Sequence, residues 1–197
     1  MDSTVDPRRI LVIDGHPDAA AGHYCHALAA AYAAGARDAG HAVEILRVAE
    51  LDFPVLRSPE EWLHEPPPPP IAAAQARIRA AQHIVMVYPL WLGDVPALFK
   101  AFLEQTLRPG FALAYADRGM PKKLLGGRSA RVIVTMGMPA IAYKVYFRAH
   151  SLKSLERNIL RFCGLDPVET TVIGGVDDPA TRADWLERMR NFGANAA

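Results

Sequence analysis

The segment that most constrains the fold runs from Val85 to Lys100 and reads VMVYPLWLGDVPALFK. It begins as an apolar run of strand length and ends as a helix-forming run, with Pro89, Leu90 and Trp91 at the turn between them. In an open parallel sheet, ligands bind where such strands end. Proline and large apolar residues border this opening, so it suits a flat aromatic ligand better than a sugar or a bare phosphate.

Strand-like and helix-like runs alternate along the whole chain. The predicted strands cover residues 9–14, 41–48, 83–88, 131–135 and 167–173. The predicted helices cover residues 22–37, 71–81, 96–107, 149–162 and 179–192, the last with Asp177 or Asp178 as its N-cap. This alternation predicts right-handed crossovers and a parallel α/β sheet covered on both faces. The sequence has no internal repeat, so we expect a single domain over residues 1–197.

Composition and charge narrow the possible partners. Lys and Arg number 22 against 21 Asp and Glu, so no strong field attracts nucleic acid or an anionic membrane. No apolar run reaches the ~18 residues of a membrane helix, and residues 1–9 lack the apolar core of a signal peptide. The two cysteines, Cys25 and Cys163, form no disulfide framework. We therefore expect a cytoplasmic protein without nucleic acid partners and without membrane insertion.

Two long segments fall outside the predicted elements. Residues 50–70 end in five consecutive prolines, Pro66–Pro70, which favour a stiff polyproline II spacer of unknown role. Residues 109–127 contain Tyr115 and three basic residues, which are Arg118, Lys122 and Lys123. Loops of about 20 residues are uncommon in compact domains and are often functional. The basic residues suit either a solvated surface loop or contact with a phosphate group.

The loop after the first strand, residues 14–26, leads into a helix and contains Gly15, His16 and Gly22. Free backbone N–H groups and the positive end of a helix dipole at such a place suit a phosphate, and His16 could add a proton donor. Many strand–helix loops carry Gly and His without binding anything, so this loop alone is a weak signal. His23 and His26 equally fit surface or capping histidines.

Several nucleotide and catalytic motifs are missing from the sequence. It has neither a Gly-x-Gly-x-x-Gly fingerprint nor a Walker A sequence, which disfavours a Rossmann dinucleotide site and nucleotide hydrolysis. The third strand ends in Tyr88-Pro89 rather than in the Asp of a receiver domain. No Gly-x-Ser-x-Gly elbow is present, and the His cluster matches no zinc spacing, so we expect no metal site.

The loop after the fourth strand offers a second set of polar groups. Thr135 could donate a hydroxyl, and Gly137 allows close backbone approach to the edge of a ring. Tyr143 could donate a phenolic hydrogen bond to a carbonyl oxygen. The alternative is that Tyr143 and Tyr146 simply pack on one helix face.

Together these segments resemble the NAD(P)H quinone oxidoreductase family of flavodoxin-like proteins, which includes the DT-diaphorase type. The resemblance extends from Ile10 to about Val176. Its most specific parts are Gly15-His16-Pro17, Tyr88-Pro89-Leu90-Trp91 with Val95-Pro96-Ala97 and Lys100, and Pro109-Gly-Phe-Ala112 with Tyr115. The resemblance implies a three-layer sandwich with a five-stranded parallel sheet in the order 2-1-3-4-5. It also implies a flavin, FAD or FMN, with NADH or NADPH as co-substrate.

By that similarity, His16 and the backbone of residues 22–26 hold the flavin phosphate; these residues are Gly22, His23, Tyr24, Cys25 and His26. The resemblance places Pro89, Leu90, Trp91 and Leu92 along one edge of the isoalloxazine ring. It places Thr135, Met136 and Gly137 at the opposite edge. Tyr143 then lies near the hydride acceptor, and Tyr115 of a second protomer covers the ring across a twofold dimer. The implied reaction is ping-pong hydride transfer through the flavin to a quinone or similar acceptor.

The chain departs from the family pattern in its phosphate loop, where His23-Tyr24-Cys25 replaces Ser-Phe-Asn. Cys25 could be a reactive thiol near a helix N-terminus or a small packing residue, and we favour packing. Two functions compete with the enzyme. One is a flavin-binding regulatory or accessory subunit of a membrane transport system. The other is an electron-carrier flavodoxin, which the near-neutral charge disfavours.

Overall fold

The computed structural model describes residues 6–116 and 119–197, so Arg118 lies outside the described residues. Five parallel strands form the central sheet in the order β2-β1-β3-β6-β7. Their bounds are β1 (Arg9–Asp14), β2 (Ala42–Arg47), β3 (His83–Pro89), β6 (Ser129–Thr135) and β7 (Val168–Ile173). In chain order this is 2-1-3-4-5, so the predicted α/β class and strand order are confirmed. The single-domain assignment stays a prediction.

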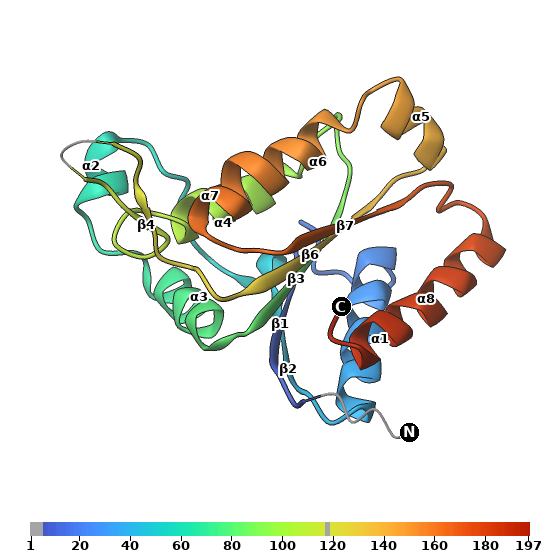
Figure 1. The fold of residues 1–197 in the computed structure, drawn as a ribbon. Coiled ribbons are helices and arrows are strands. Elements are labelled where there is room, and N and C mark those ends of the chain that lie inside the picture. Colours follow the sequence, from blue (N-terminus) through green and yellow to red (C-terminus); the bar gives the residue numbers. More distant parts are fainter. Residues whose placement is uncertain (1–5, 117–118) are drawn as a thin grey trace.

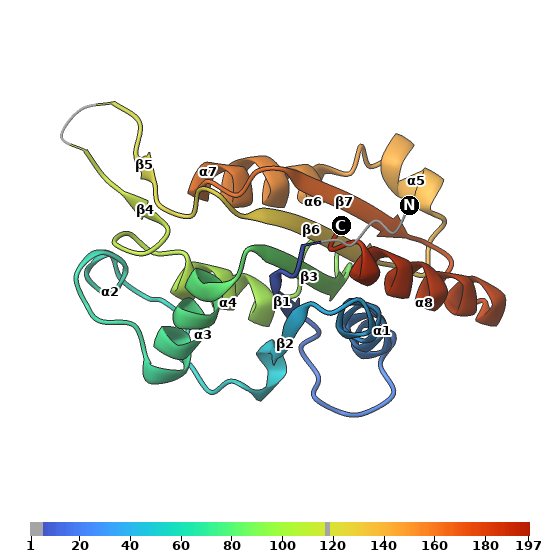
Figure 2. The ribbon, with the colours of Figure 1, turned by 60° about the horizontal axis from the view of Figure 1, so that its bottom comes forward.

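Helices cover both faces of the sheet (Figures 1 and 2). One face carries α1 (Tyr24–Asp38) and α8 (Pro179–Ala194). The other carries α3 (Pro69–Ala80), α4 (Ala97–Thr106) and the run α6 (His150–Ser154), η2 (Leu155–Leu160) and α7 (Arg161–Cys163). The 3-10 turn η1 (Val48–Glu50) follows β2, and α5 (Ala140–Val145) follows β6. The result is the predicted three-layer sandwich.

The strands are apolar on both faces because both faces are covered. In β1, Leu11 and Ile13 pack into the core on the α3 and α4 side, whereas Ile10 and Val12 pack into the core on the α1 and α8 side. This explains why short continuous apolar runs, rather than alternating ones, mark the strands in the sequence.

The long segments contain structure that the sequence does not predict. The first carries a short helix, α2 (Pro59–Leu63), whose N-cap Ser58 accepts a hydrogen bond from the Glu61 N–H. The proline run is only partly a spacer, since Pro69 and Pro70 form the first turn of α3, where a missing N–H is tolerated. The second segment carries a small hairpin of β4 (Leu113–Ala114) and β5 (Lys122–Lys123).

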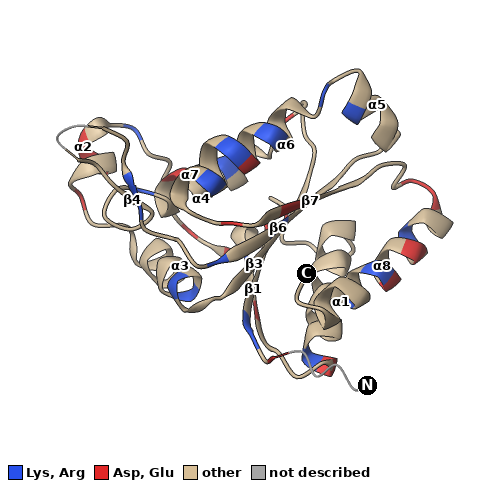
Figure 3. Ribbon diagram, viewed as in Figure 1, with Lys and Arg blue, Asp and Glu red and all other residues tan. Residues whose placement is uncertain are grey.

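Helix ends mostly lie within two residues of their predicted positions. The Asp178 side chain accepts hydrogen bonds from the Ala180 and Thr181 N–H groups, which confirms one of the two predicted N-caps of α8. The predicted helix over residues 149–162 contains a π-helical stretch, η2, and ends at Gly164 with φ 111°. Acidic and basic residues are interspersed on α8 and along α6 to α7 (Figure 3).

Helices α1 and α8 approach each other closely at two glycines. A Cβ added at Gly193 would lie 2.0 Å from the backbone oxygen of Tyr32, and one added at Gly35 would lie 2.0 Å from that of Arg190. In each case the obstacle is helix backbone, which cannot turn aside as a side chain can. The absence of side chains at these positions therefore sets the separation of the two helices.

We expect Gly193→Ala to destabilise the protein by roughly 1–3 kcal/mol, because the overpacked crossing must open. The gain of about 1 kcal/mol in helix propensity does not offset this. Urea unfolding followed by circular dichroism measures the change. Gly126→Ala is the matched control, because nothing lies within 4 Å of its added Cβ, and it should stay within about 0.5 kcal/mol of wild type. Equal stability of the two variants would contradict the steric interpretation.

Candidate active site

Three loops leave the sheet side by side at the carboxyl ends of β1, β3 and β6. Main-chain hydrogen bonds fix their starting points. The Gly15 N–H donates to the Val87 oxygen at 2.8 Å, and the Leu90 N–H donates to the Thr135 oxygen at 2.8 Å. The Met136 N–H donates to the Ile173 oxygen at 2.9 Å. The predicted site segments of all three strands are thus neighbours in space.

Asp14, the last residue of β1, organises the loop that follows it. Its side chain is 1% exposed, and Oδ1 accepts from the His16 N–H at 3.1 Å. Oδ2 lies 2.5 Å from Nδ1 of His26 in the first turn of α1. Next to it, Gly15 passes so close to the Phe99 ring that an added Cβ would lie 2.8 Å from it. The loop therefore starts in a fixed direction.

Asp18 organises the middle of the same loop. Oδ1 accepts from the Ala20 N–H at 2.8 Å, and Oδ2 pairs with Nε2 of His23 at 2.8 Å. The bond from Ala20, followed by the one from His23, lowers the pKa of the Asp18 carboxyl. The Asp18 N–H donates to Nδ1 of His16 at 3.2 Å. Two aspartates and three histidines thus form one hydrogen-bonded cluster.

The three imidazoles of this loop lie against one another. His16 stacks on His23 with ring centroids 4.0 Å apart, and His26 lies 5.3 Å from His16 in an edge arrangement. Burial lowers the pKa of His16, and the neighbouring His23 and His26 lower it further. His16 also contacts Trp91 of the next loop, with centroids 5.9 Å apart. The first and second loops therefore touch through side chains.

The N-terminus of α1 suits an anion. Its N-cap residue, His23, makes no side-chain capping bond, and its first turn holds no acidic residue. The N–H groups of a helical first turn have no partner within the helix. Gly22 precedes this turn with φ 101°, a backbone conformation that glycine adopts without strain. Tyr24 is turned away to α8, where its hydroxyl donates to the Arg182 oxygen at 2.9 Å.

Cys25 joins the α1 end of the site to β6. Its sulfur lies 3.4 Å from Oγ1 of Thr135, and both side chains are buried. Burial raises the pKa of the Cys25 thiol to about 12, so the thiolate needed for reactivity does not form at neutral pH. Cys25 is therefore a packing residue, as favoured from the sequence.

The loop after β3 makes a strained two-residue turn. Trp91 and Asp94 exchange two main-chain hydrogen bonds of 3.0 Å, with Leu92 at φ 48° and Gly93 at φ 79° between them. Such turns normally carry Asn-Gly, so a leucine here costs about 1 kcal/mol or more. The Leu92 side chain is fully exposed and Trp91 is half exposed. A strained, exposed leucine in a lone protomer is typical of a surface that something else covers.

The loop after β6 continues the apolar surface. Met136 is buried, and a Cβ added at Gly137 would lie 3.2 Å from the Asp177 carboxylate. Beyond Pro139, helix α5 and the turn after it expose four large apolar side chains, those of Ile141, Val145, Tyr146 and Phe147. Because β3 and β6 are parallel, α5 follows β6 at the same edge of the sheet from which the loop after β3 leaves.

Tyr143 does not face this surface. Its side chain is 2% exposed, its hydroxyl lies 2.8 Å from Oγ of Ser151, and it accepts from the Leu152 N–H at 3.2 Å. The predicted contact with a hydride acceptor is at odds with this burial, so we assign Tyr143 a structural role between α5 and α6. The alternative in which both tyrosines pack on one helix face holds for Tyr143 only. Tyr146 is exposed and lies against Phe147.

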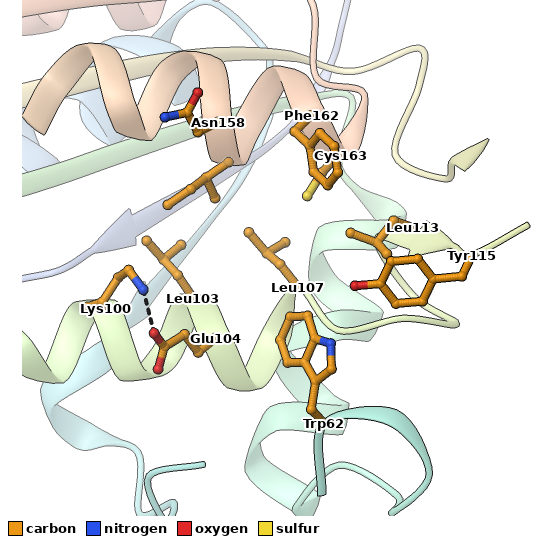
Figure 4. Close-up of a pocket in the computed structure, with 11 residues that line it drawn as sticks. Trp62, Lys100, Leu103, Glu104, Leu107, Leu113, Tyr115, Asn158, Phe162 and Cys163 are labelled. Atoms are coloured by element: carbon orange, nitrogen blue, oxygen red, sulfur yellow. Dashed lines mark hydrogen bonds and ion pairs between the residues drawn. The ribbon is translucent and has the colours of Figure 1, made fainter. Parts of the chain in front are cut away.

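Tyr115 lies away from the strand-end loops of its own chain. It lines an apolar groove of about 210 Å³ between α4 and the η2–α7 helix (Figure 4). Trp62 of α2 and Phe162 of α7 line the same groove, and Lys100 and Glu104 form an ion pair at its rim. In Figures 1 and 2 the hairpin that leads to Tyr115 and the α5 end of the sheet lie at opposite sides of the molecule.

Sequence reasoning did not identify four residues of these sites, which are Asp14, Asp18, Trp62 and Phe162. Asp14 carries a signal that could have been used, because a carboxylate directly after a buried strand lies at the ligand edge of the sheet. Asp18, Trp62 and Phe162 carry no such local signal. Their positions depend on how loops and helices far apart in the chain fold together.

Within residues 6–116 and 119–197, no group of three or more His, Cys, Asp or Glu side chains is arranged to hold a metal ion. In the same residues, every helix is too short or too polar to span a bilayer.

We expect Tyr143→Phe to lower the free energy of unfolding by about 1–2 kcal/mol, because the Leu152 N–H and the Ser151 hydroxyl lose a buried partner. Thermal unfolding measures the change. A variant of unchanged stability would contradict the structural role of the hydroxyl.

Comparisons with known proteins agree with this architecture. Residues 8–192 match the model of a family described as having a flavodoxin-like fold. An uncharacterised NAD(P)H oxidoreductase of Haemophilus influenzae is 32% identical over 110 residues, which cover 54% of this chain and 54% of that protein. FMN-dependent NADH:quinone oxidoreductase 2 of Listeria innocua is 33% identical over 106 residues, covering 53% and 49%. The matched region spans about half the length of these curated relatives.

The solved structure of an NAD(P)H:quinone oxidoreductase from Methanothermobacter marburgensis superposes with a TM-score of 0.83 at 23% identity, over 97% of this chain and 100% of that one. At this identity the likeness concerns the fold. The family match over residues 8–192 goes further and shows that the chain belongs to the family of proteins with the flavodoxin-like fold.

Proposed function

We propose that the chain is an FMN-dependent oxidoreductase that transfers reducing equivalents from NADH or NADPH to a quinone or a similar flat acceptor. The observation that carries the proposal is the meeting of three loops at one sheet edge, with an uncapped helix beside an exposed aromatic and apolar surface. A flavin mononucleotide has the same two parts, an anionic phosphate and a flat ring. The relative in Listeria innocua is named as FMN-dependent, which favours FMN over FAD.

The residues present fit the phosphate end of FMN. The first-turn N–H groups of α1 have neither a side-chain cap nor an acidic neighbour in that turn. The predicted contacts of His16 and of residues 22–26 therefore stay our proposal, with Tyr24 and Cys25 acting through their backbone because their side chains are engaged elsewhere. Helix dipole and N–H groups together stabilise a bound phosphate.

The residues at the ends of β3 and β6 fit the ring end. We assign Pro89, Leu90, Trp91 and Leu92 to one edge of the ring. Thr135, Met136 and Gly137 are assigned to the other edge, since the Leu90 N–H is bonded to the Thr135 oxygen. The apolar side chains would exclude water from the ring, and nearby main-chain N–H groups would stabilise negative charge on it.

Bound FMN would supply the redox chemistry, accepting a hydride from NAD(P)H and reducing the acceptor in a second half-reaction in which the two substrates use the same place in turn. The chain supplies position and the exclusion of water. No contact described above favours an accessory subunit of a transport system. The two buried free thiols, Cys25 and Cys163, accord with a reducing compartment, and we place the enzyme in the cytoplasm.

We further propose a homodimer that shares its active sites. Tyr115, with Trp62 and Phe162, lines the groove of Figure 4, and the hairpin that leads to Tyr115 lies across the molecule from α5 (Figure 1). This aromatic wall can therefore cover a ring bound only to another copy. The exposed apolar side chains of Leu92 and α5 supply a surface that such a copy would bury.

The purified protein mixed with FMN should bind it with the spectral shift of a protein-bound flavin, and should then oxidise NADH or NADPH in the presence of a quinone. His23→Glu adds a carboxylate next to Asp18 and should weaken FMN binding at least tenfold, which is ~1.4 kcal/mol. The control, Asn191→Glu, makes the same charge change on exposed α8. A chain that binds no flavin, or that binds it equally well in both variants, contradicts the proposed site.

Co-expression of two defective variants tests the shared site. His23→Glu damages the site of its own protomer, and Tyr115→Ala damages that of its partner. A mixed dimer isolated with two affinity tags then contains one site with both native residues, so about half of wild-type activity should return. At an FMN concentration that fills only wild-type sites, homodimers of either variant should stay well below this activity. A mixed dimer without activity would place Tyr115 outside the active site, and a monomeric wild-type protein would exclude a shared site.

A further inference from the structure

His26 is the member of the histidine cluster that joins three parts of the phosphate loop. It belongs to the first turn of α1, and its side chain is 12% exposed. Nδ1 lies 2.5 Å from Oδ2 of Asp14 at the end of β1. Nε2 lies 3.0 Å from the backbone oxygen of Asp18 in the middle of the loop. One ring therefore connects strand, loop and helix.

Both partners of the His26 ring are oxygen atoms. The Asp18 backbone oxygen can only accept a hydrogen bond. The buried Asp14 carboxylate also accepts from the His16 N–H. His26 thus links the end of β1 to the middle of the loop through its two ring nitrogens.

The other side-chain hydrogen bonds of this loop are local. Asp18 holds Ala20, His16 and His23, all within five residues of itself. His26 and Asp14 are twelve residues apart, so their contact closes the whole loop. No residue assigned above to the flavin uses the His26 side chain, since only the backbone at this position is expected to face the phosphate.

We propose that His26 is a positioning residue, a clamp between Asp14 and Asp18 that holds the loop of residues 15–23 in the shape that receives the phosphate of FMN. This inference rests on the proposed function and extends it to a residue whose side chain does not itself touch the ligand. It concerns the phosphate alone, because the ring of the flavin is assigned to the ends of β3 and β6.

The test compares FMN with riboflavin, which has the same ring and lacks the phosphate. Dissociation constants of both are measured by flavin fluorescence for wild type and for His26→Leu, which removes both ring nitrogens. We expect the affinity for FMN to fall about tenfold to a hundredfold and the affinity for riboflavin to fall less than about threefold. Loss of affinity confined to FMN is a result that general destabilisation would not produce.

Two conservative variants keep the test informative even if His26→Leu fails to fold. The amide of His26→Asn can replace Nδ1 toward Asp14, and that of His26→Gln can replace Nε2 toward the Asp18 oxygen. Both should bind FMN with affinities between those of wild type and His26→Leu. Asn191→Leu on α8 is the control for an unrelated polar-to-apolar change.

Three results would overturn the clamp. FMN affinity equal to wild type in the His26 variants would remove His26 from the site. Equal weakening of FMN and riboflavin would make its role merely structural. A third contrary result is that the Asn and Gln variants, with intact circular dichroism, bind FMN no more tightly than His26→Leu does. This would show that the two hydrogen bonds are irrelevant. If wild type binds neither flavin, the proposed function fails, and the wild-type titration alone reveals it.

Discussion

The structure depends on a parallel sheet that is buried on both of its faces. A strand of such a sheet needs apolar side chains in both directions, and its connections must cross over as helices. All five strands therefore end at one edge, and the loops after β1, β3 and β6 start within hydrogen-bonding distance of a neighbouring strand. Any ligand site at this edge is assembled from segments that are far apart in sequence.

Two polar side chains of this edge, Asp14 and Thr135, are tied to the protein rather than left free. Asp14 uses both carboxylate oxygens on the loop that follows it, and Thr135 contacts Cys25 across the sheet. What stays open is main chain at the start of α1 and apolar surface at Trp91 and Leu92. A site of this kind holds a ligand by its shape and by its phosphate, and leaves the chemistry to the ligand.

The fold could be predicted from the sequence because its signals are local. Apolar runs of strand length, helix-forming runs between them and prolines at helix starts are all read within a few residues. The resemblance then supplied the strand order. The helix α2 escaped prediction because its cap, Ser58, stands among prolines that favour extended chain. The burial of the Tyr143 side chain was not predicted because its hydroxyl bonds to Ser151 and Leu152, which are eight and nine residues away on another helix.

The loops after β1, β3 and β6 were correctly expected to lie together, whereas the contacts inside them could not be read from the sequence. The Asp14–His26 contact spans twelve residues, and Trp62 meets Tyr115 and Phe162 only through tertiary packing. Periodicity and spacing describe one element at a time, so they do not predict contacts between distant elements. The proposal that Tyr115 serves a second protomer likewise depends on tertiary placement, which the sequence does not describe.

The most direct measurement is a crystal structure of the protein grown with FMN. The phosphate should lie at the loop of residues 15–23 and the first turn of α1, with the ring against residues 89–92 and 135–137 and with Tyr115 of a second protomer over it. Two results would contradict this arrangement. One is FMN bound to a lone protomer in the groove lined by Trp62, Tyr115 and Phe162. The other is no flavin at the carboxyl ends of the strands at saturating FMN.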